Sequence, residues 1–132
     1  MPCGIYDDEA RFKLLAEDVT TIEKAMKEIT DLSAAGDKNY NQLVRWINTK
    51  DEHATKFQRI IADYFLTQRI KPIAATDTAK YAEYQSMVEL CHQLMVEAMK
   101  CKQTTDLSHP AKLTELIAAF KKVYNGKHGH HH

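Results

Sequence analysis

The sequence is poor in the residues from which many catalytic loops are built. It holds four glycines and three prolines in 132 residues, and they form no glycine-rich phosphate loop. It also lacks a Cys-x-x-Cys pair and a serine nucleophile elbow, so the metal and hydrolase motifs built on those patterns are absent.

An excess of charge of either sign is also missing. The 18 lysines and arginines balance 18 aspartates and glutamates, which indicates neither a nucleic-acid partner nor a membrane surface. Charged residues interrupt the longest apolar stretches every few positions, so we expect no transmembrane helix. No signal peptide is visible, and we expect a cytoplasmic location.

The three cysteines do not form a disulfide framework, because their number is odd and their spacing irregular. Cys91 and Cys101 are ten residues apart, which is neither the i+3 nor the i+4 spacing at which two helical side chains become neighbours. We expect both to be buried helix residues. Cys3 differs from them, because it lies before the first predicted helix.

What the sequence does hold is a strong helical periodicity. Apolar residues recur in alternating steps of three and four, the spacing of a helix-bundle seam. Helices are predicted at about residues 8–34, 38–69, 77–103 and 108–126. The predicted helix ends are Asp7 or Asp8, Thr76 or Asp77 and Ser108 as N-caps, and Gly36 and Gly126 as C-terminal stops.

Four helices joined by short loops pack as antiparallel neighbours, so the predicted fold class is all-α, an antiparallel four-helix bundle. We expect an N-terminal segment at residues 1–7, a bundle at 8–126 and a tail at 127–132 that ends in what looks like an expression tag, Gly129–His132. The predicted core includes Phe12, Val19, Ile22, Ile47, Phe57, Ile61, Val88, Met95, Ile117 and Phe120.

Polar residues near the apolar seams require a separate interpretation. Lys50 interrupts the seam of the second helix, and we expect its stem to follow apolar surface while its charge reaches water. His53 lies on the flank of that helix in a line with Trp46 and Ile60. It is either a half-buried histidine bonded to a neighbour or a group that supports or binds a metal. We expect His109 to face solvent.

The N-terminal segment carries the chemistry that the helices lack. Its sequence, Pro2-Cys3-Gly4-Ile5-Tyr6-Asp7, places a thiol and a phenol in one short loop before the first helix. Gly4 permits backbone angles that are closed to other residues, so a tight turn can form directly after the cysteine. We therefore expect a thiolate and a phenol at one end of the bundle.

This segment resembles the end of the N-terminal metal hook of the nickel superoxide dismutases, whose pattern reads His-Cys-x-x-Pro-Cys-Gly-[Val/Ile]-Tyr-Asp. Two further stretches are similar to that family. Lys50–Ala54 is similar to its Lys-Glu-Glu-His-Ala stretch, and Asp63–Phe65 to its Asp-Tyr-Phe near the end of the second helix. The similarity of motifs covers the first half of the chain, and that of the helix plan covers all of it.

The resemblance implies an antioxidant oxidoreductase that disproportionates superoxide at nickel, in a homohexamer of bundles. It implies that Cys3 is the second hook thiolate, that Tyr6 lies beside the open coordination face and that Tyr64 is the second tyrosine of that site. Thiolate donors and a deprotonated amide stabilise the higher oxidation state of such a metal.

Alternatives remain open, because the His-Cys pair of the hook pattern would lie before Met1. In one interpretation further residues precede Met1 and complete a nickel site. In another the chain starts at Met1, and Cys3 and His53 form a copper site, since copper accepts imidazole and thiolate ligands. A third interpretation is a non-catalytic helical bundle that binds metal or serves as an interaction module.

Overall fold

The computed structural model describes residues 4–35 and 39–128. Cys3, Gly36 and the tag, for which the sequence gives predictions, lie outside these residues. The elements in chain order are α1 (Asp8–Ala34), α2 (Tyr40–Arg59), the π-helix η1 (Ile60–Arg69), α3 (Thr78–Gln103) and α4 (Ser108–His128).

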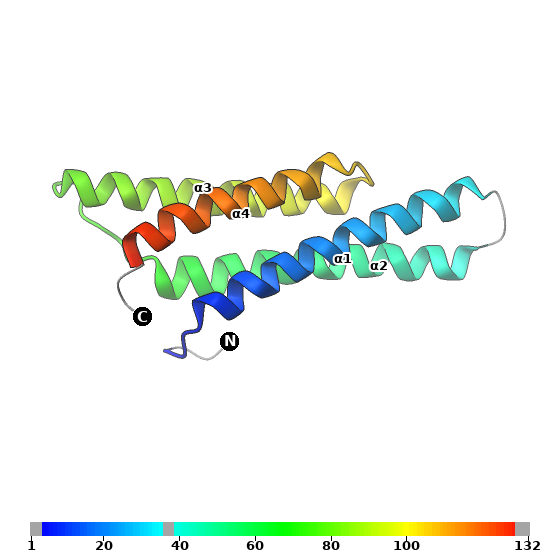
Figure 1. Ribbon diagram of the computed structural model, residues 1–132, viewed down its shortest axis with the longest axis horizontal. Helices are drawn as coiled ribbons and strands as arrows, with labels where there is room; N and C mark the ends of the chain where they lie inside the picture. Colours follow the sequence, from blue (N-terminus) through cyan, green and yellow to red (C-terminus); the bar gives the residue numbers. More distant parts are fainter. Residues whose placement is uncertain (1–3, 36–38, 129–132) are drawn as a thin grey trace.

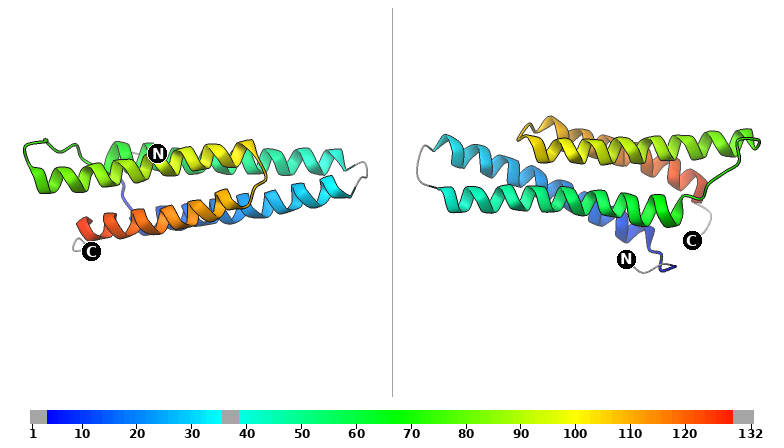
Figure 2. Two further views of the ribbon diagram at one scale, coloured as in Figure 1. Left: turned by 90° about the horizontal axis from the view of Figure 1, so that it is seen from above. Right: turned by 180° about the vertical axis from the view of Figure 1, so that it is seen from behind.

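The helices form two antiparallel hairpins that pack against each other, which confirms the predicted four-helix bundle (Figure 1). The α1–α2 hairpin and the α3–α4 hairpin are staggered along the long axis, so part of α1 and α2 extends past the other two helices (Figures 1 and 2). The start of α1, the end of η1 and the C-terminal part of α4 lie at the same end of the molecule.

Side-chain caps explain the starts of α1 and α3. Asp7 accepts a hydrogen bond from the amide of Ala10 at 3.1 Å, and Asp77 accepts one from Lys80 at 3.4 Å. The start of α4 at Ser108 agrees with the predicted range, but Ser108 is the first residue of the helix and not its cap, and its amide donates to the Asp106 carboxylate at 2.9 Å. The predicted stop at Gly126 is wrong, because the helix continues through Gly126 to His128.

The second predicted helix is continuous, but its backbone hydrogen bonding changes from the α-helical to the π-helical pattern. From Ile60 onward it is a π-helix, and the amide of Ile70 closes it by donating to Phe65, five residues back, at 2.8 Å. The side chain of Thr67 also donates to a carbonyl five residues back. Because a π-helix turns less per residue than an α-helix, the side chains of its last turn face other directions than the sequence pattern suggests.

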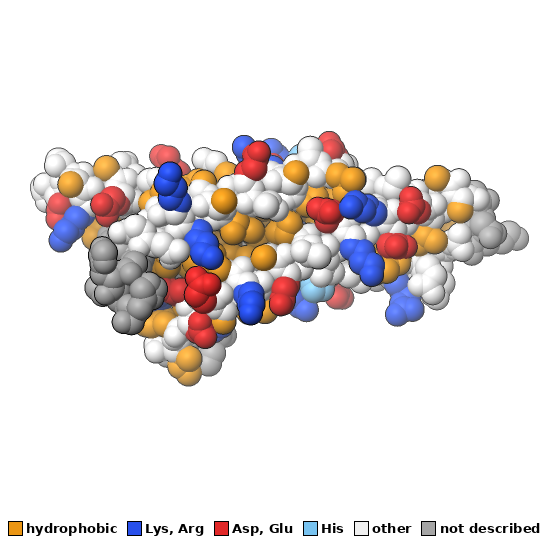
Figure 3. All heavy atoms as spheres, viewed as in Figure 1, with side chains coloured by type: hydrophobic (Ala, Val, Ile, Leu, Met, Phe, Trp, Pro, Cys, Tyr) orange, Lys and Arg blue, Asp and Glu red, His pale blue; other side chains and the backbone are white. Residues whose placement is uncertain are grey.

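The core follows the predicted seams with one exception. Figure 3 shows hydrophobic side chains in the seam between α4 and α1, with charged side chains on either side. Of the ten predicted core residues, Val88, Met95 and Ile117 are half-buried against the core. The prediction for Ile47 is wrong, because its side chain is 37 % exposed. The buried ones are Phe12, Val19, Ile22, Phe57, Ile61 and Phe120.

The side chain of Lys50 does not reach water as predicted, and its contacts show where α3 ends beside α2. Its side chain is buried, and its ammonium donates to the carbonyls of Cys101 at 2.6 Å and Lys102 at 2.8 Å, in the last turn of α3. Lys50 therefore caps the C-terminus of α3 instead of reaching water. Since α3 ends level with Lys50, the earlier residues of α2, including Ile47, extend beyond its cover. None of the described helices is long and apolar enough to cross a membrane.

Candidate metal-binding end of the bundle

The N-terminal segment is attached to the bundle at the end of η1. The amide of Gly4 donates to the side-chain carbonyl of Gln68 at 3.2 Å, and Gly4 has a φ of +82°, the left-handed region that favours glycine. The side-chain amide of Gln68 in turn donates to the Asp63 carbonyl, five residues back in the π-helix. The residue directly after Cys3 is thus fixed in both direction and position.

The two tyrosines of the predicted site, Tyr6 and Tyr64, come together beside this attachment. The ring of Tyr6 lies edge-on to that of Tyr64, with centroids 6.2 Å apart. Tyr64 is buried, whereas Tyr6 is 44 % exposed. The guanidinium of Arg69 covers the Tyr6 ring at 4.3 Å from its centroid, and that of Arg11 lies 4.8 Å from the Tyr64 ring.

Asp8, the first residue of α1, joins this helix to η1 and, through Arg69, to α4. Its carboxylate accepts hydrogen bonds from the hydroxyl of Tyr64 at 2.5 Å and from Nε and Nη2 of Arg69, both at 3.1 Å. The Arg69 Nε also lies 3.1 Å from the hydroxyl oxygen of Tyr124 on α4. Burial raises the pKa of the Asp8 carboxyl, but the hydrogen bonds from Arg69, Tyr64 and Tyr124 outweigh it and hold that pKa below its usual value.

The same contacts keep both buried phenols protonated. Burial, and then the hydrogen bond to the Asp8 carboxylate, raise the pKa of Tyr64 to about 12. Burial and Asp8 also raise the pKa of Tyr124. Tyr64 therefore stays protonated throughout the neutral pH range, and its hydroxyl donates a hydrogen bond to the Asp8 carboxylate.

The thiols differ in their fitness as metal ligands. Cys91 and Cys101 are fully buried, as predicted, and burial raises the pKa of each thiol to about 12. Since the thiolate is the metal-binding form, these two are poor ligands. Among the described residues no group of three or more histidine, cysteine or acidic side chains could hold a metal. The described part of the bundle thus lacks a metal cage, and the N-terminal segment holds the remaining thiol, that of Cys3, next to Gly4.

The structure does not bring His53 to the described part of the N-terminal segment, residues 4–7. Its Nδ1 lies 2.9 Å from the carboxylate of Asp18, a half-buried contact between α2 and α1. Asp18 follows Asp8 by ten residues, which is about 15 Å along a helix axis. Burial raises the pKa of Asp18, and the hydrogen bond with His53 offsets only part of that effect.

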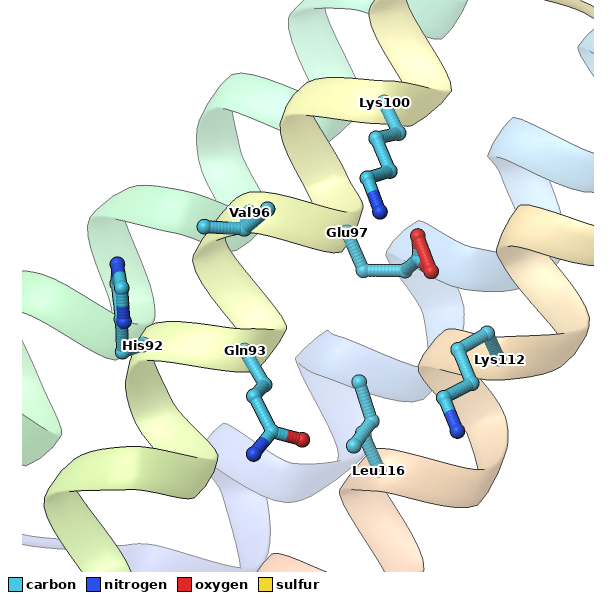
Figure 4. Close-up of a pocket in the computed structure, with 7 residues that line it drawn as sticks. All are labelled: His92, Gln93, Val96, Glu97, Lys100, Lys112 and Leu116. Atoms are coloured by element: carbon cyan, nitrogen blue, oxygen red, sulfur yellow. The ribbon is translucent and has the colours of Figure 1, made fainter.

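A second histidine–carboxylate pair joins α3 to α4, and it corrects a prediction. His109 does not simply face solvent, because its Nδ1 lies 3.0 Å from the buried carboxylate of Glu97. A cavity of about 310 Å³ lies in the same region (Figure 4). There Gln93 and Glu97 extend from α3 toward Lys112 on α4. The cavity contains none of the predicted site residues.

Sequence reasoning missed Asp8, Gln68, Arg69 and Tyr124. Its position at the start of the first helix indicates only a capping role for Asp8, and the other three belong to no motif. Their partners are more than fifty residues away in the chain, so local spacing gives no signal for them.

The fold and this site together define a class: all-α proteins whose cysteine-bearing N-terminal segment docks on a tyrosine-rich end of a four-helix bundle. The family model for nickel-containing superoxide dismutase matches residues 1–128. The chain therefore belongs to the nickel-containing superoxide dismutase family, which makes it a superoxide dismutase with nickel as its cofactor. No curated protein and no solved structure matches it.

Proposed function

We propose that the chain disproportionates superoxide at nickel held by its N-terminal segment, with Cys3 as a thiolate ligand. The observation that carries this proposal is the docking of the segment at the end of η1. Gly4 is bonded to Gln68, and Tyr6 packs on Tyr64, so the residue next to Cys3 is fixed beside two phenols. The poor fitness of the two buried thiols supports the same choice of ligand.

Nickel held by this segment would supply one-electron exchange with superoxide. Two superoxide anions and two protons give one O₂ and one hydrogen peroxide. The protein has to bring in the anion and the protons. The charge of Arg69 is paired with Asp8, whereas the guanidinium of Arg11 adds positive charge beside the Tyr64 ring, and this charge favours the approach of an anion.

The two tyrosines have different tasks in this proposal. Tyr6 is partly exposed, so its phenol can exchange protons with water at the mouth of the site. Tyr64 is buried and directs its proton onto Asp8, so its ring forms a wall behind Tyr6 and does not serve as a ready acid. Proton supply through Tyr6 and water is therefore the simpler route.

A ligand role for His53 stays a prediction. Its contact with Asp18 supports the alternative of a half-buried, hydrogen-bonded histidine. Family membership does not favour a copper enzyme or a non-catalytic bundle.

A homohexamer, which the family resemblance implies, is also part of the proposal. The first turns of α2 offer a surface for such assembly, because Tyr40 is 69 % exposed and Val44 53 % exposed on a helix that α3 does not cover there. The cytoplasmic location stays a prediction.

Metal reconstitution tests the proposed function. The metal-free protein is loaded with nickel or with copper, and superoxide decay is followed by stopped-flow absorbance. We expect nickel to produce fast decay and copper to leave it near the uncatalysed rate. Activity with copper and none with nickel would support the copper alternative instead.

A further inference from the structure

We propose that Arg69 is a positioning residue, which fixes the N-terminal segment over Tyr64 in the orientation that metal binding requires. The inference rests on the proposed function and extends it to a residue that no motif singles out. It starts from the three different elements that this one guanidinium joins: the N-terminal segment, the start of α1 and the end of α4.

The first contact is a two-pronged ion pair with Asp8. Nε and Nη2 of Arg69 each donate to a different carboxylate oxygen at 3.1 Å, the fork geometry that fixes direction as well as distance. The side chains of Arg69 and Asp8 are 20 % and 26 % exposed, so water screens the pair less than it screens a surface pair. Asp8 begins α1, so this pair joins η1 to the helix that continues from the segment.

The second contact reaches the segment itself. The guanidinium carbon lies 4.3 Å from the centroid of the Tyr6 ring, within the range of a cation–π contact. The preceding residue, Gln68, holds Gly4 by a hydrogen bond. Two consecutive residues of η1, Gln68 and Arg69, thus hold two alternate residues of the segment, Gly4 and Tyr6.

Both contacts come from the last turn of the π-helix. Its wider turn changes the angle between successive side chains, so Gln68 and Arg69 point in directions that an α-helix over the same residues would not give them. A lysine could keep the charge at position 69, but it has neither the planar fork for Asp8 nor the flat face for Tyr6. The proposal therefore predicts that charge alone is not sufficient.

Nickel binding by the metal-free full chain tests the proposal. Nickel chloride is titrated against a coloured chelator, and far-UV circular dichroism reports the helix content of each variant. We expect Arg69→Gln to weaken nickel affinity about 10- to 100-fold, as for residues that orient metal ligands. Arg59→Gln removes the same charge from an exposed position at the end of α2 and should leave the affinity unchanged.

Arg69→Lys keeps the result interpretable if the glutamine variant folds poorly. We expect the lysine variant to fold and still to bind nickel more weakly than the unmodified chain. Unchanged affinity in Arg69→Lys, or an equal loss in Arg69→Gln and Arg59→Gln, would overturn the proposal.

Two further variants separate this inference from the proposed function. In a Tyr6→Leu background the effect of Arg69→Gln should shrink, because its contact on the segment is already gone, and full additivity of the two effects counts against the inference. Cys3→Ser in the same titration judges the proposed function alone. If it abolishes nickel binding while Arg69→Gln binds normally, only the role of Arg69 fails.

Discussion

At the scale of single residues, Tyr64 differs from an ordinary tyrosine because its hydroxyl contacts the Asp8 carboxylate. With a pKa raised from 10.0 to about 12, Tyr64 should titrate late in an ultraviolet titration of tyrosinate. Asp8→Asn removes the charge and should move this late phase to lower pH, whereas Asp31→Asn, on the exposed part of α1, should not. A late phase unchanged in Asp8→Asn would show that Asp8 does not hold the phenol proton.

The same shift predicts how stability depends on pH. Above pH 10.0 the unfolded chain loses the Tyr64 proton, while the folded chain keeps it until about pH 12. The folded state therefore binds more protons in this window, and the free energy of unfolding should fall as pH rises, by about 1.4 kcal/mol per pH unit for one such group. Urea unfolding at several pH values, compared with Tyr64→Phe, measures this slope.

Lys50 is a second residue whose role depends on its partners. Its ammonium satisfies two carbonyls at the end of α3, so Lys50→Met leaves both without this donor. We expect the free energy of unfolding to fall by about 1–3 kcal/mol. Lys13→Met, at an exposed position of α1, is the matched control and should change it by less than about 0.5 kcal/mol. Equal effects in urea unfolding would refute the capping role.

At the scale of elements, the sequence predicts the presence and buried faces of the helices better than their internal hydrogen bonding and their ends. The seam of α1 is buried throughout, because steps of three and four residues suffice to identify a buried helix face. The π-register of η1 could not be predicted, because an extra residue per turn leaves apolar spacing ambiguous over ten residues. The end of α4 was misjudged because one glycine weakens a helix without ending it.

Some residues of the candidate site could be predicted from the sequence and others could not. Tyr6 and Tyr64 were predicted from motifs and lie together. The pair of Asp8 with Arg69 joins residues 61 positions apart, and no local pattern specifies such a contact. A charged residue on a helix is usually solvated, so only the packing of η1 against the start of α1 reveals that Arg69 is paired with Asp8.

Each helical hairpin contains one histidine–carboxylate pair, His53 with Asp18 and His109 with Glu97. His53→Ala leaves a buried carboxylate without its partner, which should cost about 1–3 kcal/mol in urea unfolding. His109→Ala should cost a similar amount and serves as the control.

The same two variants decide whether His53 serves the metal. From its contact with Asp18 we expect nickel affinity to stay within about twofold in His53→Ala, compared with a 10- to 100-fold loss for a residue that orients a ligand. Complete loss of nickel binding in His53→Ala, with His109→Ala unaffected, would establish His53 as a ligand.

At the scale of the whole molecule, the stagger of the two hairpins leaves the first turns of α2 uncovered. If this surface joins chains in a hexamer, Val44→Lys should reduce the mass measured by light scattering and leave the helix content unchanged. Asn48→Lys adds the same charge to an exposed position of the same helix and should leave the mass unchanged. A hexamer that persists in Val44→Lys would exclude this surface from the interface.

Cys3 is the thiol from which we expect nickel binding, since the other two thiols are buried and protonated at neutral pH. The decisive measurement is the nickel content and superoxide decay rate of Cys3→Ser, with Cys91→Ala as the matched control. We expect Cys3→Ser to lose nickel and activity together while Cys91→Ala keeps both, because the thiolate is the metal-binding form and burial keeps Cys91 a protonated thiol. Full nickel content and full activity in Cys3→Ser would contradict the central claim.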